Sequence, residues 1–319
     1  MTDGSPEADA SSLARGPAWK TWAPWVGAVG VVSWVLYQVP MGEVIAASRE
    51  AQLGWFFAAV LGGVAFWFLL DSFGFSLLFS RFNAPLSWSE ARTLRGVTYL
   101  LAALNWNIGT AGLVLFLRRV KGIPALRSTS SLLFYAILDI SALLLMGTIG
   151  AAYLETSEDL ARFGTVAGGI IGAMLLFLVV LVPDIPEWGW LQRLRDWSVF
   201  RTPRAAGPRD YFVFLVLRLA YFTIFALVFF FGAKAFGLAV SLPLAMASTP
   251  LILLSGALPI APGGIGTHAA AMLYFWPDAG EQGAVVALGL LLPFALTGGR
   301  VILGLPYLAE FRRLQDAAD

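Results

Sequence analysis

The sequence predicts an all-α, polytopic membrane protein with six transmembrane helices, two re-entrant helical hairpins and a candidate inverted repeat. Of its 319 residues, 58% are hydrophobic and only 13% are charged, and the mean hydropathy is +0.76. A soluble domain carries roughly 25% charged residues. Several apolar runs reach the roughly 20 residues that a helix needs to cross a bilayer. The composition therefore places the chain in a membrane.

Eight apolar segments follow one another along the chain. They cover residues 22–41, 53–79, 97–117, 132–153, 163–182, 211–231, 236–258 and 284–306. We expect residues 22–306 to form one transmembrane domain, between a disordered cytoplasmic N-terminus at 1–21 and a cytoplasmic tail at 307–319. The first segment exceeds a signal-peptide core of about 7–15 residues, so we interpret it as an uncleaved span, with cleavage as the alternative.

The distribution of basic residues tests how many segments cross the membrane. If all eight cross, 9 Lys and Arg face the cytoplasm and 10 face outward, whereas the positive-inside rule requires a clear excess on one side. If residues 97–117 and 236–276 are instead re-entrant hairpins, the counts become 16 and 3. We therefore predict six spans and two hairpins, with both termini cytoplasmic and the domain in a bacterial inner membrane.

Each predicted hairpin carries helix-breaking residues at its middle. The first has Asn105, Asn107, Gly109 and Gly112, and the second has the Pro- and Gly-rich run 258–268. Unwound backbone at membrane depth is tolerated only where protein buries it or where it lines a cavity. Asn105 and Asn107 are candidate substrate contacts, with hydrogen bonding at the hairpin tip as the alternative.

The order of span, span, hairpin and span occurs twice along the chain. Because each half has an odd number of spans, the second half is inverted relative to the first. Inverted repeats with broken helices near the midplane are typical of transporters and of their binding sites.

The loop at 183–210 is predicted to carry a cytoplasmic interfacial helix. Trp190, Leu194 and Trp197 fall on one helical face, and Arg193 and Arg195 would favour anionic headgroups. We interpret this helix as a membrane anchor, and a regulatory or lipid-sensing role is the alternative.

Four ionisable side chains fall inside predicted spans, namely Asp71, Asp139, Arg218 and Arg300. Charged groups at such depth are costly and are usually functional or paired. Asp139, Arg218 and Arg300 are candidates for binding a substrate headgroup, with an arginine on a phosphate. The alternative is structural pairing, with the arginines extending to the interface.

His268, the only histidine, follows the glycine-rich turn and is expected to begin a returning half-helix. A helix N-terminus offers free N–H groups and a positive potential. Gly263, Gly264 and Gly266 could therefore present backbone N–H groups to a phosphate, with His268 as a polar contact or proton-linked group. The alternatives are a histidine that bridges the turn and glycines that allow close packing.

The sequence contains none of the motifs that carry soluble enzyme chemistry. There is no cysteine, which excludes disulfides, thiol catalysis and cysteine-based metal sites. A phosphate-binding Walker loop, a G-x-S-x-G elbow and an H-E-x-x-H helix are absent. We therefore predict no catalytic residue, no metal, no cofactor and no enzymatic activity.

Residues 258–269 resemble a known family. They read Leu-Pro-Ile-Ala-Pro-Gly-Gly-Ile-Gly-Thr-His-Ala, similar to the signature Leu-Pro-x-x-Pro-Gly-Gly-x-Gly-x-x-Glu-Ala. That signature marks the flippase-like transmembrane family typified by the membrane region of lysylphosphatidylglycerol synthases, the multiple peptide resistance factors. The resemblance extends over approximately residues 53–313, including a similar basic segment at 118–123. It implies the family's helical fold, in a stand-alone membrane module without the synthase domain.

Several ionisable residues of the family are replaced in this chain. His268 stands where the signature has Glu, and Tyr135 and Ala136 stand where the family has a Glu-Arg pair, while Asp139 is kept. The resemblance therefore implies the fold more strongly than it implies a substrate.

These observations together predict a lipid or lipid-linked headgroup transporter that moves a polar-headed lipid between leaflets. Its partners would be a membrane phospholipid or lipid-linked substrate, and a membrane enzyme or a second copy of the chain, but no nucleic acid. One alternative is a proton-coupled transporter of a small polar solute, which would give solute-dependent pH transients. Another is a non-transporting partner protein, which would co-purify with a stoichiometric membrane enzyme.

Overall fold

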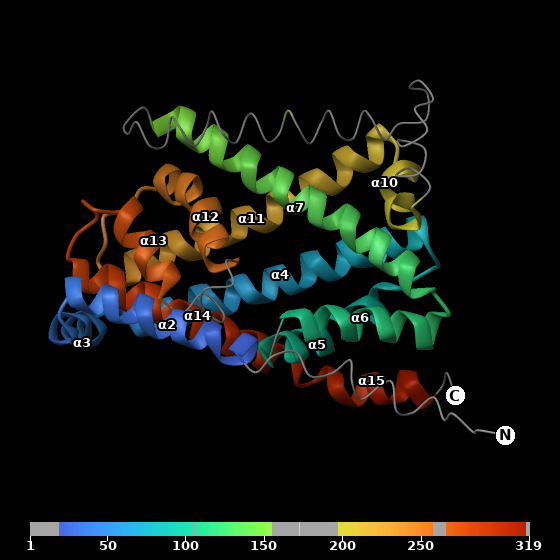
Figure 1. Ribbon diagram of the computed structural model, residues 1–319, viewed down its shortest axis with the longest axis horizontal. Coiled ribbons are helices and arrows are strands. Elements are labelled where there is room, and N and C mark those ends of the chain that lie inside the picture. The colour runs from blue at the N-terminus through green and yellow to red at the C-terminus, as the bar shows by residue number, and fades with distance from the viewer. Residues whose placement is uncertain (1–18, 105, 155–171, 173–196, 258–265, 317–319) are drawn as a thin grey trace.

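The computed structural model in Figure 1 is a bundle of helices that run along one another. It describes residues 19–104, 106–154, 172, 197–257 and 266–316. These described residues form helices, turns and connecting segments without any strand, which confirms the predicted all-α class.

Four helices are long and apolar enough to cross a membrane. They are α4 (Leu53–Phe82), α7 (Ala125–Leu154), α11 (Pro208–Ala235) and α14 (Gln282–Gly304). At about 1.5 Å per residue, each of them exceeds the roughly 30 Å of a hydrocarbon core. Four predicted spans are thereby confirmed as long apolar helices, while the predicted span at 163–182 lies outside the described residues.

The first predicted span ends in a sharp bend. α2 (Trp19–Gln38) and α3 (Met41–Glu50) form a pair bent by 84°. Pro40 precedes α3, lacks a backbone N–H and disfavours helical backbone at Val39. The helix of the predicted span 22–41 therefore stops before this proline, and the chain continues in a new direction.

The first predicted hairpin consists of two helices that pack against each other, α5 (Trp88–Leu104) and α6 (Trp106–Lys121). Near their junction, a Cβ atom at Gly109 would lie 3.1 Å from the carbonyl oxygen of Thr98. At their far ends, Lys121 Nζ lies 2.6 Å from Glu90 Oε1. The chain therefore turns back between the two arms and returns to the end of the bundle where it started.

Two glycines that were predicted to interrupt the helix at the middle of this hairpin instead lie inside α6. Gly109 faces Ala102 and Thr98, and a Cβ atom at Gly112 would lie 2.6 Å from Leu101 Cδ1. Their role is to let the two arms approach closely, because any side chain there would meet the opposite helix. The interruption itself falls at residue 105, outside the described residues.

The second predicted hairpin also forms a pair of packed helices, α12 (Leu242–Ala257) and α13 (Thr267–Phe275). Near the tip, Ser255 Oγ donates a hydrogen bond of 3.3 Å to the Thr267 carbonyl. At the open end, Trp276 Nε1 donates to Ser248 Oγ over 2.9 Å. The tip at 258–265, which contains Gly263 and Gly264, lies outside the described residues.

The helix packing repeats within the chain. If α4, α5, α6 and α7 are exchanged with α11, α12, α13 and α14, the packed pairs stay the same. Within the halves, the packed pair α4 with α5 corresponds to α11 with α12. Between the halves, α7 packs on α12 as α14 packs on α5. Likewise, α7 packs on α11 as α14 packs on α4. In Figure 1, the α5–α6 and α12–α13 hairpins lie on opposite sides of the central pair α4 and α11. The repeated order predicted from the sequence therefore has a counterpart in the packing.

The central pair α4 and α11 is antiparallel along its whole length. At one end Arg81 Nε lies 3.1 Å from Asp210 Oδ1, and at the other the Gln52 N–H donates to the Ala235 carbonyl over 2.8 Å. Midway, the rings of Trp67 and Phe225 stack with their centroids 3.7 Å apart. The two halves are therefore joined through a packed aromatic interface between α4 and α11.

Small residues allow the last helix of each half to cross the hairpin of the other half. A Cβ atom at Gly150 of α7 would lie 2.5 Å from Ala247 Cα of α12. In the corresponding place, a Cβ atom at Gly304 of α14 would lie 2.6 Å from the carbonyl oxygen of Gly96 of α5. Both crossings bring backbone against backbone, which larger side chains would prevent.

Basic side chains gather at the end of the bundle where α4 ends and α11 begins. Three short elements also lie there: η1 (Ser198–Phe200), α10 (Arg201–Ala205) and α15 (Tyr307–Asp316). The basic residues at this end are Arg81, Arg92, Arg118, Arg119, Lys121, Arg127, Arg201, Arg204, Arg209, Arg312 and Arg313. Within the described ranges, the opposite end carries only Arg49 and Lys234. Segments that the positive-inside rule assigns to one side thus meet at one end of the bundle.

We expect Gly289→Ala to destabilise the bundle and Gly298→Ala, in the same helix, to leave it unchanged or slightly more stable. A Cβ atom at Gly289 would overlap Ala269 of α13, whereas a Cβ atom at Gly298 meets nothing within 4 Å. Overpacking costs about 1–3 kcal/mol, while a helical Gly→Ala change without a clash stabilises by about 0.4–1 kcal/mol. The measurement is the temperature at which the purified protein loses its monodisperse size-exclusion peak. Equal temperatures for both variants would contradict the tight α13–α14 contact.

Candidate functional site

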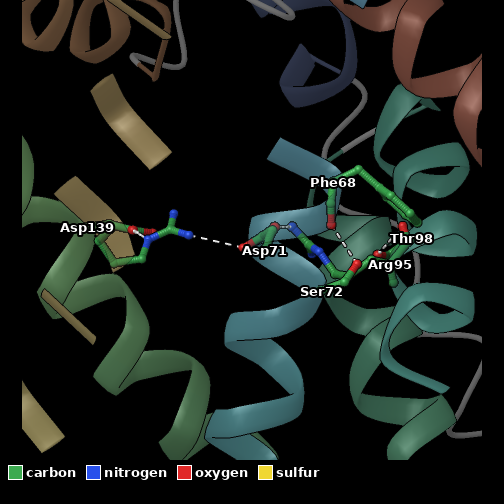
Figure 2. Close-up of polar contacts among 7 residues, drawn as sticks. Phe68, Asp71, Ser72, Arg95, Thr98 and Asp139 are labelled. Carbon is green, nitrogen blue, oxygen red and sulfur yellow. Dashed lines mark hydrogen bonds and ion pairs between the residues drawn. The ribbon is translucent and has the colours of Figure 1, made fainter. Parts of the chain in front are cut away.

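Four ionisable side chains form a continuous network inside the bundle. Asp71 accepts a hydrogen bond from Arg95 Nη2 at one oxygen and from Arg218 Nη1, at 3.0 Å, at the other. Arg218 Nε in turn donates to Asp139 Oδ1. Figure 2 shows Asp71 between Asp139 on one side and Arg95 on the other. Two acids and two bases thus neutralise one another in a row.

The network joins the two halves of the repeated bundle. Asp71, Arg95 and Asp139 come from α4, α5 and α7 of the first half, whereas Arg218 comes from α11 of the second. Arg218 is therefore the member through which both aspartates of the first half contact the second. A movement that separates the halves at Arg218 must stretch or break these ion pairs.

The network is buried at one end and accessible at the other. Asp71 is only 2% exposed and Arg218 only 5%. The side chain of Asp139, by contrast, keeps 32% of its surface exposed. A ligand that approaches the network therefore meets Asp139 first.

Aromatic rings hold both arginines of the network in place. The Arg218 guanidinium carbon lies 4.0 Å from the centroid of the Tyr221 ring and 4.6 Å from that of Tyr135. The Arg95 guanidinium carbon lies 5.1 Å from the Tyr99 ring centroid. Cations within about 6 Å of a ring centroid are attracted by its negative face, so these rings stabilise the charges where water is excluded.

Three of the four charged residues predicted inside spans are part of this network. Arg300 of α14 is not. Its guanidinium carbon lies 5.9 Å from the Tyr99 ring, and it has no ion pair with a described carboxylate. Arg95 instead supplies the second positive charge. Arg300 is thus a half-buried cation next to a neutral network, and both Arg300 and Arg95 lie within about 6 Å of the Tyr99 ring centroid.

Arg95 was missed by the sequence analysis. The sequence predicts an apolar segment that begins at residue 97, which leaves Arg95 in a cytoplasmic loop. In the structure α5 begins at Trp88, and Arg95 lies about two turns further along, 8% exposed. The available signal was the run 93–99, which contains no other charged residue.

His268 lies at the start of α13, as predicted. Gly266 before it has a φ of +82°, a left-handed conformation that favours glycine, and its Cα faces Val31 and Val32 of α2. The imidazole packs on Gly256 of α12, where a Cβ atom would collide with the ring. His268 is 8% exposed, and its Nδ1 has no hydrogen-bond partner in the described part of the chain. It belongs to neither the network nor its aromatic walls.

The side chains of the remaining predicted site residues lie outside what the structure describes. Asn107 lies in the first turn of α6, and Asn105, Gly263 and Gly264 lie outside the described residues. Among the described residues, no group of three His, Asp or Glu side chains could hold a metal ion.

Long apolar helices around a buried ion network define a polytopic membrane protein with a polar centre. The comparison with protein families gives a more specific identification. The sequence model described as "Lysylphosphatidylglycerol synthase TM region" matches residues 22–304, so the chain belongs to this family. The resemblance inferred from residues 258–269 is confirmed. No curated protein matches the chain.

We expect Arg95→Gln to lower the thermal stability of the purified protein strongly. The change leaves Asp71 with one guanidinium, and breaking a buried ion pair costs about 3–5 kcal/mol. Adding Asp71→Asn should restore part of the loss, because the uncompensated carboxylate then disappears.

The matched control is Arg81→Gln, which removes an exposed arginine from a pair with Asp210 and should have little effect. If Arg95→Gln behaves like this control in the size-exclusion assay, the network does not stabilise the bundle.

Proposed function

We propose that the chain moves a polar-headed lipid, or a lipid-linked headgroup, between the two leaflets of a bacterial inner membrane. The observation that carries this proposal is the buried ion network that links the two halves of the repeated bundle. Ionisable groups at membrane depth are rare, pair with one another and mark substrate or ion pathways. Membership of the lysylphosphatidylglycerol synthase TM family supports a lipid-related substrate.

We assign Arg300 to an anionic part of the substrate for as long as Arg218 stays paired with Asp139. Arg95 and Arg218 are neutralised by Asp71 and Asp139, whereas Arg300 faces the Tyr99 ring without an ion pair to a described carboxylate. An unpaired guanidinium binds phosphate oxygens through charge-assisted hydrogen bonds. Such contacts lower the cost of carrying a polar headgroup through hydrocarbon.

The repeated packing supports an alternating-access mechanism. Each half contributes a long central helix, a hairpin and a last helix, and the two central helices are antiparallel. Two such halves can rock against each other around a fixed polar centre. In this mechanism the hairpins α5–α6 and α12–α13 are re-entrant, and the backbone crossings at Gly150 and Gly304 are the contacts on which the halves turn.

We expect Arg300→Gln to slow lipid movement in vesicles that contain the purified protein. Fluorescent phosphatidylglycerol is placed in both leaflets, and dithionite, added outside, quenches the outer label at once and the inner label only as it flips. Loss of hydrogen bonds to a charged group costs about 1.5–3 kcal/mol, or about 10- to 100-fold in rate.

Arg127→Gln, at the exposed start of α7, is the matched control and should flip lipid at the wild-type rate. If vesicles with the wild-type protein quench no faster than empty vesicles, the proposed lipid transport is wrong.

The proposed orientation places the basic end of the bundle in the cytoplasm. The chain has no cysteine, so single cysteines can be introduced directly. With a membrane-impermeant maleimide on intact cells, Asp278→Cys should label, whereas Arg81→Cys and Arg127→Cys, on either side of the first hairpin, should label only after lysis. Labelling of Arg127→Cys but not Arg81→Cys on intact cells would mean that α5 and α6 together cross the membrane.

A second candidate function is proton-coupled transport of a small polar solute. The observation that favours it is His268, a buried imidazole whose Nδ1 lacks a described partner and which begins a half-helix. A histidine in such a place can carry a proton between two states. Solute-dependent pH changes inside protein-containing vesicles, lost in His268→Gln, would favour this function over lipid movement.

A further inference from the structure

We propose that the Asp139 carboxylate occupies, on Arg218, the position that the phosphate of a phosphate-bearing headgroup takes when it binds. Asp139 is then an internal competitor, which leaves Arg218 as the ligand arrives. The inference rests on the proposed lipid function for its ligand class. It is carried by the difference between the two carboxylates that contact Arg218.

Arg218 is fixed independently of Asp139. Its Nη1 donates to Asp71 over 3.0 Å, and the rings of Tyr221 and Tyr135 lie 4.0 and 4.6 Å from its guanidinium carbon. Asp139 holds only the Nε edge. The guanidinium therefore keeps its place when this one contact is exchanged for another anion.

The two carboxylates differ in how firmly they are held. Asp71 is 2% exposed and accepts hydrogen bonds from both Arg95 and Arg218. Asp139 has 32% of its side-chain surface exposed, and Arg218 is its only described ion-pair partner. Of the two, Asp139 is the one that can be displaced without uncovering the core.

The outer surface of α7 leads to this carboxylate. Ala136 and Ile140, which lie beside Asp139 along α7, are both exposed, and Ile140 keeps 45% of its surface. A headgroup moving along this face meets Asp139 before it meets Arg218. Ala136 and Ile140 are small or apolar, so the pair of Asp139 and Arg218 is the first charged group that a headgroup meets on this face.

The exchange conserves charge. With Asp139 in place, Asp71, Arg95, Arg218 and Asp139 sum to zero. When Asp139 withdraws, Asp71, Arg95 and Arg218 together carry one positive charge, which a singly charged phosphate group neutralises again. The released Asp139 carboxylate takes up a proton from water, so the total charge stays at zero. Guanidinium groups bind carboxylate and phosphate oxygens with the same planar geometry, so one anion can replace the other.

The exchange also changes the connection between the halves. Asp139 belongs to α7 of the first half and Arg218 to α11 of the second. Its departure removes one of the two ion pairs across this boundary and leaves the pair of Arg218 with Asp71. Headgroup binding would thereby loosen α7 from α11, which ties occupancy of the site to movement of the halves.

The test compares headgroup binding by wild-type protein and Asp139→Asn. Asparagine keeps the shape and a hydrogen-bond acceptor for Arg218 but removes the competing charge. Isothermal titration of the detergent-purified full chain with dihexanoylphosphatidic acid should give about tenfold tighter binding in Asp139→Asn, equivalent to about 1.4 kcal/mol. Dihexanoylglycerol, without the phosphate, should show no difference between the two proteins.

Two further variants serve as controls for the binding measurement. Asp210→Asn removes a carboxylate paired with an arginine at the exposed end of the bundle and should bind the probe as the wild type does. Arg218→Gln should bind at least tenfold more weakly than Asp139→Asn. Unchanged or weaker binding by Asp139→Asn overturns the proposal, because Asp139 would then be a structural partner of Arg218 only.

A measurement on the wild-type chain decides the question if Asp139→Asn fails to fold. A carboxylate released from its arginine reacts more readily with dicyclohexylcarbodiimide, so labelling of Asp139, read by peptide mass spectrometry, should rise with dihexanoylphosphatidic acid. Constant or reduced labelling overturns the proposal.

Inorganic phosphate serves as a second probe of the source of the ligand. If it raises labelling as the lipid does, the site recognises phosphate chemistry alone. If only the lipid does so, the acyl chains are also recognised. Both results support the exchange.

These experiments separate the inference from the proposed function. Tighter binding by Asp139→Asn in a protein that flips no lipid would sustain the exchange and reject lipid transport. Lipid flipping by the wild-type protein, with no change in binding by Asp139→Asn, would support lipid transport and reject the exchange.

Discussion

Asp71 is held between two guanidinium groups in the middle of an apolar bundle, and this contact fixes the relative positions of three helices. A buried carboxylate without a partner would cost several kcal/mol, so α5 and α11 must each bring an arginine to α4. The position of Arg218 then determines where Asp139 of α7 must lie to accept its hydrogen bond. The order of charges along the network follows from this one requirement of neutrality. The aromatic rings around both arginines then stabilise the guanidinium charges through cation–π contacts where water is excluded.

The hairpins depend on a different constraint, the need to bring backbone close to backbone. Gly150 meets Ala247 and Gly304 meets Gly96, so the last helix of each half lies directly on the hairpin of the other. Inside a bilayer the hydrophobic effect does not drive helices together, because lipid tails are as apolar as the helix surfaces. Dispersion contacts at such close crossings hold the helices together instead. The polar network and the two small-residue crossings are therefore complementary. The network joins the halves by charge at the centre, and the crossings join them by shape away from it.

The sequence was sufficient for features that depend on composition over many residues. Four long apolar helices, the paired arms of both hairpins and the buried positions of Asp71 and Arg218 were predicted from it. It was insufficient where tertiary contacts override local pattern. Gly109 lies inside a helix because the opposite arm covers it, and Arg95 is buried because Asp71, 24 residues earlier, neutralises it. Neither partner is visible within one segment, since side-chain pairing across helices leaves no periodic signal.

The charges that the chain lacks also bear on what its centre can bind. His268 stands where the resembling family signature has a glutamate, and this histidine lies apart from the network. Asp71 and Asp139 are already committed to Arg95 and Arg218, so no carboxylate of the network is left to receive a cationic group. Arg300, by contrast, stands beside the neutral network without a described acid. The residual charge of this centre is therefore positive, and a negatively charged group is the ligand that electrostatics favours there.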